Sequence, residues 1–138
     1  MRWDDVVLAC RTEAAADPVL AGIYGTEAIR MGATAQDFRV PGLEYQIIGD
    51  TETELWEPII MQWDQWTADY ADLVASERAL RKLFDHRLPV EIEGVYMFSI
   101  FTDGASLVDA PDRAGFYGRA VRFRLSPIRE DLRLGRST

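Results

Sequence analysis

Hydrophobic and polar residues alternate along several stretches of the chain, the pattern expected of β-strands with one buried face. These stretches are residues 43–48, 59–66, 95–102 and 119–125, and a shorter strand is expected at residues 27–31. In the last strand Val121 and Phe123 point toward the core, whereas Arg122 and Arg124 point outward. The 95–102 stretch is strongly apolar, which predicts either burial on both faces or one face covered by a neighbouring subunit.

Two other stretches have the spacing of amphipathic helices. The first runs from Asp4 or Asp5 to Ala16, and its acids suit a helix N-terminus. The second covers residues 67–84, with Thr67 as the expected N-cap. Its predicted buried stripe consists of Tyr70, Leu73, Val74, Leu80 and Phe84.

The second helix follows the 59–66 strand with almost no turn, and further strands come after it. Such a helix must fold back over the sheet. The sequence therefore predicts an α+β fold: a mixed or antiparallel sheet of about four to five strands, with two helices packed on one face. Residues 1–127 are expected to form a single domain and residues 128–138 a polar C-terminal tail. Residues 49–58 are predicted as an acidic loop or hairpin arm, and residues 103–117 as a long loop.

Charge is spread unevenly along the 138 residues, whose net charge is −8. The negative total argues against general nucleic-acid binding, because affinity there comes mainly from neutralising phosphates. Residues 40–77 contain nine acids and no base, whereas residues 118–138 contain six arginines against two acids. Two interpretations stay open: a solvated acidic face with a basic tail, or a two-signed molecule that packs head-to-tail against copies of itself.

No stretch approaches the ~18 consecutive apolar residues of a membrane span, and the acidic start of the chain does not resemble a signal peptide. We therefore expect a soluble protein made in the cytosol, without a membrane partner.

Residues that commonly carry catalysis or bind metals are few, since the chain has one His and one Cys. His86, just past the second helix, is interpreted as a surface or helix-end histidine. Cys10, among Val and Ala on the first helix, is interpreted as a small core residue. Glu52 and Glu54 have no apolar neighbour placed to separate their pKa values for acid–base catalysis.

The acids of the 103–117 loop lack the alternate-position spacing of a calcium site. The sequence thus predicts no catalytic residue, no metal and no cofactor, and function is expected in surfaces and assembly. The candidate interface residues are Glu52, Glu54, Trp56, Asp103, Asp109, Arg119, Arg122 and Arg124. Among them Trp56, in an acidic connection, is a candidate anchor.

Four stretches in a fixed order carry a resemblance to a known family. They are residues 16–21 (Ala-Asp-Pro-Val-Leu-Ala), 41–46 (Pro-Gly-Leu-Glu-Tyr-Gln), 61–66 (Met-Gln-Trp-Asp-Gln-Trp) and 117–125 (Tyr-Gly-Arg-Ala-Val-Arg-Phe-Arg-Leu). With them the chain resembles the tail-terminator (tail-completion, head–tail joining) proteins of long-tailed bacteriophages, nearly throughout its length as far as Pro127. Arg122 departs from the pattern, because an acid is common there in the family.

The resemblance implies a hexameric ring that stacks on the last ring of tail-tube protein, stops tube growth and meets the head-completion or connector protein. It implies a structural, non-enzymatic role in the virion, at the tail–head junction, after synthesis in the host bacterial cytoplasm. DNA would pass through the lumen without specific binding. The alternatives are another phage neck or head-closure protein and a small-ligand-binding or hydrolase-like α+β domain. The latter needs a pocket with a convergent polar cluster.

Overall fold

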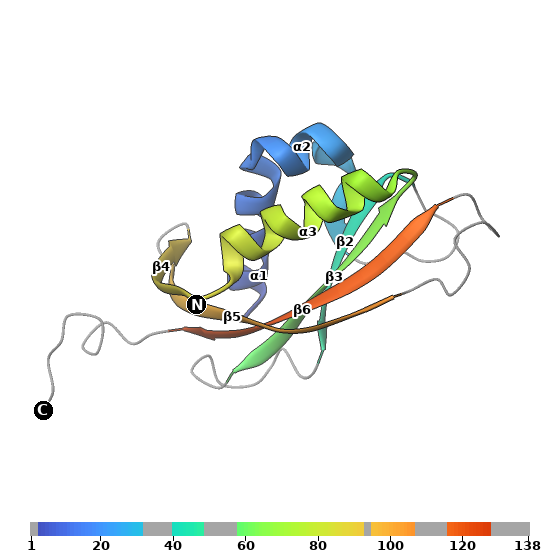
Figure 1. Ribbon diagram of the computed structural model, residues 1–138. Helices are drawn as coiled ribbons and strands as arrows, with labels where there is room; N and C mark the ends of the chain where they lie inside the picture. Colours follow the sequence, from blue (N-terminus) through green and yellow to red (C-terminus); the bar gives the residue numbers. More distant parts are fainter. Residues whose placement is uncertain (1–2, 32–39, 49–57, 93–94, 107–115, 128–138) are drawn as a thin grey trace, which may run out of the picture.

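The computed structural model describes residues 3–31, 40–48, 58–92, 95–106 and 116–127. Its elements are, in chain order, α1 (Trp3–Ala16), α2 (Pro18–Tyr24), a 3-10 turn (Thr26–Ala28), β1 (Ile29–Met31), β2 (Gly42–Ile48), β3 (Ile59–Thr67), α3 (Tyr70–Phe84), β4 (Arg87–Ile92), β5 (Val95–Ser106) and β6 (Tyr117–Pro127). The strands form one sheet in the order β1-β2-β3-β6-β5-β4. The β1–β2 pair is parallel and the other pairs are antiparallel. The three α-helices lie on one face of this sheet (Figure 1), which confirms the predicted α+β class.

The sheet differs from the sequence prediction at its β4–β5 edge. Within the described residues it has six strands rather than four or five, because β4 follows α3 directly and pairs with β5. In addition, the 103–117 segment is not a loop throughout. After a register shift between Phe101 and Asp103, β5 continues to Ser106, which pairs with Arg119. The local Asp-Gly-Ala-Ser sequence favours a turn, but the long neighbouring strand offers it hydrogen-bond partners.

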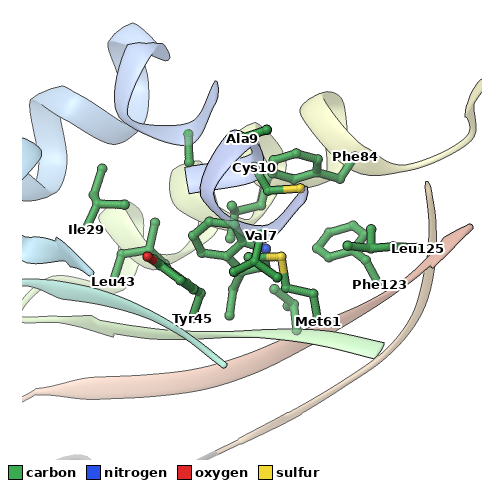
Figure 2. Close-up of a cluster of buried hydrophobic side chains, with 14 of the residues drawn as sticks. Val7, Ala9, Cys10, Ile29, Leu43, Tyr45, Met61, Phe84, Phe123 and Leu125 are labelled. Atoms are coloured by element: carbon green, nitrogen blue, oxygen red, sulfur yellow. The ribbon is translucent and has the colours of Figure 1, made fainter. Parts of the chain in front are cut away.

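The core lies between the helices and the sheet, and Figure 2 shows side chains from α1, α3 and the strands converging there. At its centre Trp63 is 1% exposed and lies 5.4 Å from Tyr45 between ring centroids. The Trp63 ring stacks on Phe84 of α3 at 5.8 Å, and Phe84 in turn meets Phe123 of β6 edge-on at 5.8 Å. These rings join α3 to the two central strands.

Polar contacts attach α1 and α2 to the rest of the fold. The guanidinium of Arg11 on α1 donates hydrogen bonds to the backbone carbonyls of Ile29, at 3.1 Å, and Thr26, at 3.0 Å. The hydroxyls of Tyr24 on α2 and Ser76 on α3 are 2.6 Å apart in the buried space between these helices. The Tyr24–Ser76 contact satisfies two hydroxyls that burial would otherwise leave unpaired.

The start of α3 is two residues beyond the predicted cap. Thr67 is the last residue of β3, and its hydroxyl donates to the carbonyl of Asp69 at 2.9 Å. Asp69 is the actual N-cap, since its carboxylate accepts a hydrogen bond from the amide of Ala71 at 2.7 Å. Asp and Thr are both favoured at the N-cap, so the sequence alone could not distinguish Asp69 from Thr67 as the cap.

The predicted buried stripe of α3 is correct only in part. Leu73, Leu80 and Phe84 are buried, but Tyr70 is 62% exposed and Val74 is 37% exposed. The buried residues follow one another at helical spacings of three and four along the line that faces the sheet. Tyr70 and Val74 lie beside this line, so their burial was a wrong prediction.

The faces of β5 and β6 also test the sequence pattern. Met97 and Ser99 of β5 are buried on the helix side, while Phe98 and Ile100 on the opposite face are half-buried. The prediction that this strand is buried on both faces is therefore wrong for a single chain. The alternative, that a neighbouring subunit covers one face, stays a prediction. In β6 the alternation is as expected, with Val121 and Phe123 buried and Arg124 exposed.

Replacing a leucine at the helix–sheet contact should destabilise the protein. Leu80 on α3 has no exposed surface, so Leu80→Ala is expected to lower the free energy of unfolding by about 2–5 kcal/mol. Leu8 on α1 is 58% exposed, and Leu8→Ala makes the same chemical change outside the core. Urea unfolding of both variants measures the effect. Equal losses for the two would contradict the assigned core.

Candidate assembly interface

The candidate interface residues fall into two groups in the structure. Glu52, Glu54, Trp56 and Asp109 lie outside the described residues. The other four are brought to neighbouring strands, Asp103 on β5 and Arg119, Arg122 and Arg124 on β6. Arg119 points to the helix side of the sheet, where it meets Glu77 of α3, whereas Arg122 and Arg124 alternate with it and point to the opposite, helix-free face.

A hydrogen-bonded network crosses this helix-free face. Arg122 forms an ion pair with Asp103 at 3.1 Å and donates to the side-chain oxygen of Gln62 at 2.8 Å. The amide of Gln62 donates to Asp64 at 2.7 Å, and Gln46 donates to the other carboxylate oxygen of Asp64 at 3.1 Å. The network thus connects β2, β3, β6 and β5. Two residues predicted separately as interface residues, Asp103 and Arg122, are partners of each other.

Asp64 sits in the middle of this network, and its pKa is raised above the usual value. Burial of the carboxyl is the largest cause, and the neighbouring Glu44, which lies opposite it on β2, adds to it. The hydrogen bonds from Gln62 and Gln46 and the charge of Arg122 act in the opposite direction. The face is therefore polar but partly closed to solvent.

On the helix side, an open groove of about 680 Å³ lies between α3 and the β5–β6 pair. Its apolar lining comes from Tyr70, Leu73, Val74 and Tyr117. The rings of Tyr70 and Tyr117 meet edge-on at 5.7 Å between centroids, at the end of the groove where α3 begins. Tyr70 and Val74, predicted as core residues, are instead the exposed apolar wall of this groove.

The charged lining of the groove is mainly basic. Arg119 forms an ion pair with Glu77 of α3 across the groove floor. Arg81 lies over the ring of Phe101, with its guanidinium carbon 4.1 Å from the ring centroid, and Arg78 is exposed on the same helix. Arg78 and Arg81 were not among the predicted residues. The sequence did hold one indication of this groove: the apolar stripe of α3 is too wide for all of its residues to be buried.

Below the same end of α3, Trp66 of β3 lies across β6 on the helix-free face. A Cβ atom at Gly118 would come within 2.3 Å of Cζ3 of Trp66, so only glycine leaves room for this ring. Trp66 also meets the ring of Phe116 edge-on at 5.6 Å between centroids. The start of β6 is therefore flanked by aromatic rings on both faces of the sheet.

Catalytic chemistry finds little support in the described part of the chain. Cys10 is fully buried, and burial raises the pKa of its thiol to about 12, which confirms its interpretation as a core residue. His86 has an exposed side chain whose Nδ1 lies 2.7 Å from Asp85. Among the described residues no three His, Cys, Asp or Glu side chains are placed to hold a metal ion. No helix there is long and apolar enough to cross a membrane.

Comparison with known proteins identifies a shared fold. The sequence matches no protein-family model, and no curated protein matches it significantly. Among solved structures, the fold is similar to a chain from "Virion of native gene transfer agent (GTA) particle", with a TM-score of 0.60 and 14% sequence identity. The match covers 87% of this chain and 92% of that chain. At this identity the likeness establishes the fold alone, and it extends over nearly the whole virion chain.

The thiol of Cys10 should be inert while the protein is folded. Because the raised pKa leaves almost no thiolate at pH 8 and the side chain is buried, a soluble aromatic disulfide reagent should react with it only after unfolding. Absorbance at pH 8 with and without 6 M guanidinium, roughly sufficient for full unfolding, measures the reaction. Rapid reaction of the folded protein would contradict this placement.

The raised pKa of Asp64 should make its contribution to stability depend on pH. The folded state holds this proton more tightly than the unfolded state, whose carboxyl titrates near 3.8, so the charged carboxylate costs stability as pH rises through the folded pKa. Asp64→Asn cannot titrate. The unfolding free energy of the native protein minus that of this variant should therefore decrease as pH rises from below 3.8, and then level off.

Urea titrations at a series of pH values measure this difference. Glu91→Gln, which removes an exposed acid on β4, controls for the loss of a surface charge. A difference that instead grows with pH would show that hydrogen bonds and charge, rather than burial, dominate at Asp64.

Proposed function

We propose that this protein is a structural component of a bacteriophage or phage-like virion, where it caps the tail tube, ends its polymerisation and forms the joint to the head connector. It acts as a ring, of six copies by the family resemblance. Its partners are then other copies of itself, the tail-tube protein and the head-completion or connector protein. It requires no cofactor and performs no catalytic turnover.

The observation that carries this proposal is the fold shared with a virion-particle chain over 92% of that chain's length. The fold likeness comes from backbone geometry, whereas the tail-terminator resemblance comes from the order of short sequence stretches. The two kinds of support are independent, and both lead to a particle component. The finer role, at the tail–head junction, rests on the sequence resemblance.

The surface of the chain supports a role in assembly. The helix-free face carries the half-buried Phe98 and Ile100 of β5 beside the polar network around Arg122. The helix side carries an open groove with aromatic and basic walls. A ring subunit that ends a polymer needs two different surfaces, one that fits the tube and one that does not repeat it. The two faces of this sheet differ in that way.

Charge supports passage of DNA without binding. The net charge of −8 repels phosphates, and Arg122 is paired with Asp103 instead of being presented alone. Arg119 is likewise paired with Glu77. A lumen lined by such a chain would not bind the DNA backbone. A conduit for DNA must avoid such binding, because it would stop the DNA from passing.

The alternatives differ in how well the site supports them. Another neck or head-closure protein is compatible with the same fold, and the junction phenotype below separates it. A hydrolase or small-ligand protein would need convergent polar groups around a reactive centre. The groove instead has an open basic and aromatic wall, which suits a macromolecular surface better.

A particle made without this protein should fail at the end of its tail. We expect tails that are longer than normal or unable to join heads, because nothing stops addition of tube subunits. Electron microscopy of lysates from a deletion strain, with the gene restored from a plasmid as control, measures tail length and joining. Tails of normal length that join heads would refute the proposal; a defect confined to heads would favour a head-closure role.

A further inference from the structure

The groove between α3 and the β5–β6 pair is a positively charged surface on an acidic protein. Among the described residues, its charged lining consists of Arg78, Arg81 and Arg119 against the acid Glu77, so its formal balance is +2 on a chain whose total is −8. The sign of the groove is therefore opposite to that of the whole chain. Such a local surplus favours a negatively charged ligand at this place and no other part of the described groove opposes it.

Arg119, at the floor of the groove, has hydrogen-bond donors that the fold does not use. Its Nε donates to Glu77 of α3, but its two terminal nitrogens make no hydrogen bond within the part of the chain that the structure describes. Gly104 of β5 leaves space for this end of the side chain, because a Cβ atom at Gly104 would lie 2.5 Å from Nη2 of Arg119. The terminal nitrogens therefore form a planar pair of donors, a shape that fits a carboxylate through two parallel hydrogen bonds.

Two further arginines line the α3 side of the groove. Arg81 is held in place, since its guanidinium carbon lies 4.1 Å from the centroid of the Phe101 ring and its Nη2 lies 3.7 Å from the carboxylate of Asp85. Arg78 is exposed and makes no hydrogen bond or ion pair with the other described residues. Arg78 is therefore free to pair with an acid of a ligand, and it lies on the same groove as the unused donors of Arg119.

The remaining lining of the groove is apolar and includes exposed rings. Tyr70 and Val74 are both exposed, and the ring of Tyr70 meets that of Tyr117 edge-on. Aromatic rings beside arginines are typical of the residues that contribute most to protein–protein binding. Carboxylates alone would leave these rings in water, so the matching ligand also carries a large apolar or aromatic side chain.

We propose that this groove binds an acidic segment of another protein of the particle, with its carboxylates paired to Arg78 and Arg119 and an aromatic side chain packed against Tyr70 and Val74. The inference rests on the proposed function, because a subunit that ends a polymer must contact a protein other than its own copies. Nucleic acid matches the groove less well. Its affinity comes from neutralising many phosphates, and this groove offers few arginines on a chain of net charge −8.

Synthetic peptides with blocked ends measure this recognition directly. The first has the sequence Asp-Glu-Trp-Glu-Asp-Leu, and the second, Asn-Gln-Trp-Gln-Asn-Leu, replaces each acid by its amide. In isothermal titration calorimetry at low salt, the acidic peptide should bind at least ~10-fold more tightly than the amide peptide. A third peptide, with Ala in place of Trp in the acidic sequence, should also bind more weakly, because it leaves the exposed rings of the groove uncovered.

Variants of the protein locate the binding site. Arg78→Glu should weaken binding of the acidic peptide at least ~10-fold. Lys82→Glu makes the same kind of charge reversal on α3, at an exposed residue outside the groove lining, and should leave binding unchanged. Gly104→Ala keeps every charge but fills the space beside the guanidinium of Arg119, so it should weaken binding by moving the donors. Circular dichroism and thermal unfolding verify that each variant is folded.

Several results would overturn this inference. They include equal binding of the acidic and amide peptides, no binding of either, and binding that Arg78→Glu leaves unchanged. Displacement of the acidic peptide by single-stranded DNA would assign the groove to phosphates instead. Self-association of the protein that is lost in Arg78→Glu, measured by sedimentation velocity, would assign the groove to a second copy instead of another protein.

The deletion strain separates this inference from the proposed function. A plasmid copy with Arg78→Glu should restore at least ~10-fold fewer joined particles than the unchanged gene, whereas Lys82→Glu should restore as many as the unchanged gene. Full restoration by Arg78→Glu would overturn the role of the groove and leave the function standing. A deletion strain without any tail defect would instead refute the function, while the peptide measurements would still test the groove.

Discussion

The stack of Trp63 on Phe84, continued edge-on by Phe123, is the contact on which the rest of the structure depends. These rings come from β3, α3 and β6, so one cluster holds α3 against the two central strands of the sheet. The burial of three aromatic side chains excludes water from the helix–sheet contact and contributes more than any polar contact described nearby. This aromatic cluster fixes the position of α3. The position of α3 in turn determines the shape of the groove beside it.

Because α3 is held over β3 and β6, it does not cover the helix side of the far end of β5. The carboxylate of Asp85, just beyond α3, accepts a hydrogen bond from the amide of Phe101 at 2.9 Å, next to the register shift in β5. This contact fixes β5 to the end of the helix while the strand continues to Ser106. The space left between them is the groove, and Tyr70 and Val74 are exposed along it because they lie beside the line of α3 that faces the sheet.

The helix-free face has a different physical basis. Its charged groups satisfy one another across strands, with Arg122 between Asp103 and Gln62 and with Asp64 between two glutamine amides. Such a network can be partly buried without leaving polar groups unpaired, so another subunit can cover it at a low desolvation cost. The groove, with its surplus of positive charge and exposed rings, instead favours a partner of opposite charge. One chain thus offers a neutralised face and a charged groove, two different surfaces of the kind that the proposed ring would need.

The sequence by itself determined the class of fold, the core strands and most of the core. Alternation placed Val121 and Phe123 inward and Arg124 outward, and helical spacing identified Leu73, Leu80 and Phe84, because these patterns depend only on periodicity and on one sheet face being buried. Tertiary structure alone decided the rest. Pairing with a long neighbour made a strand of 103–106, where the local Asp-Gly-Ala-Ser sequence favours a turn. The angle of α3 left Tyr70 and Val74 in the groove, and strand order brought Arg122 to Asp103 and Arg119 to Glu77. Those contacts join residues far apart in the chain, so no local pattern contains them.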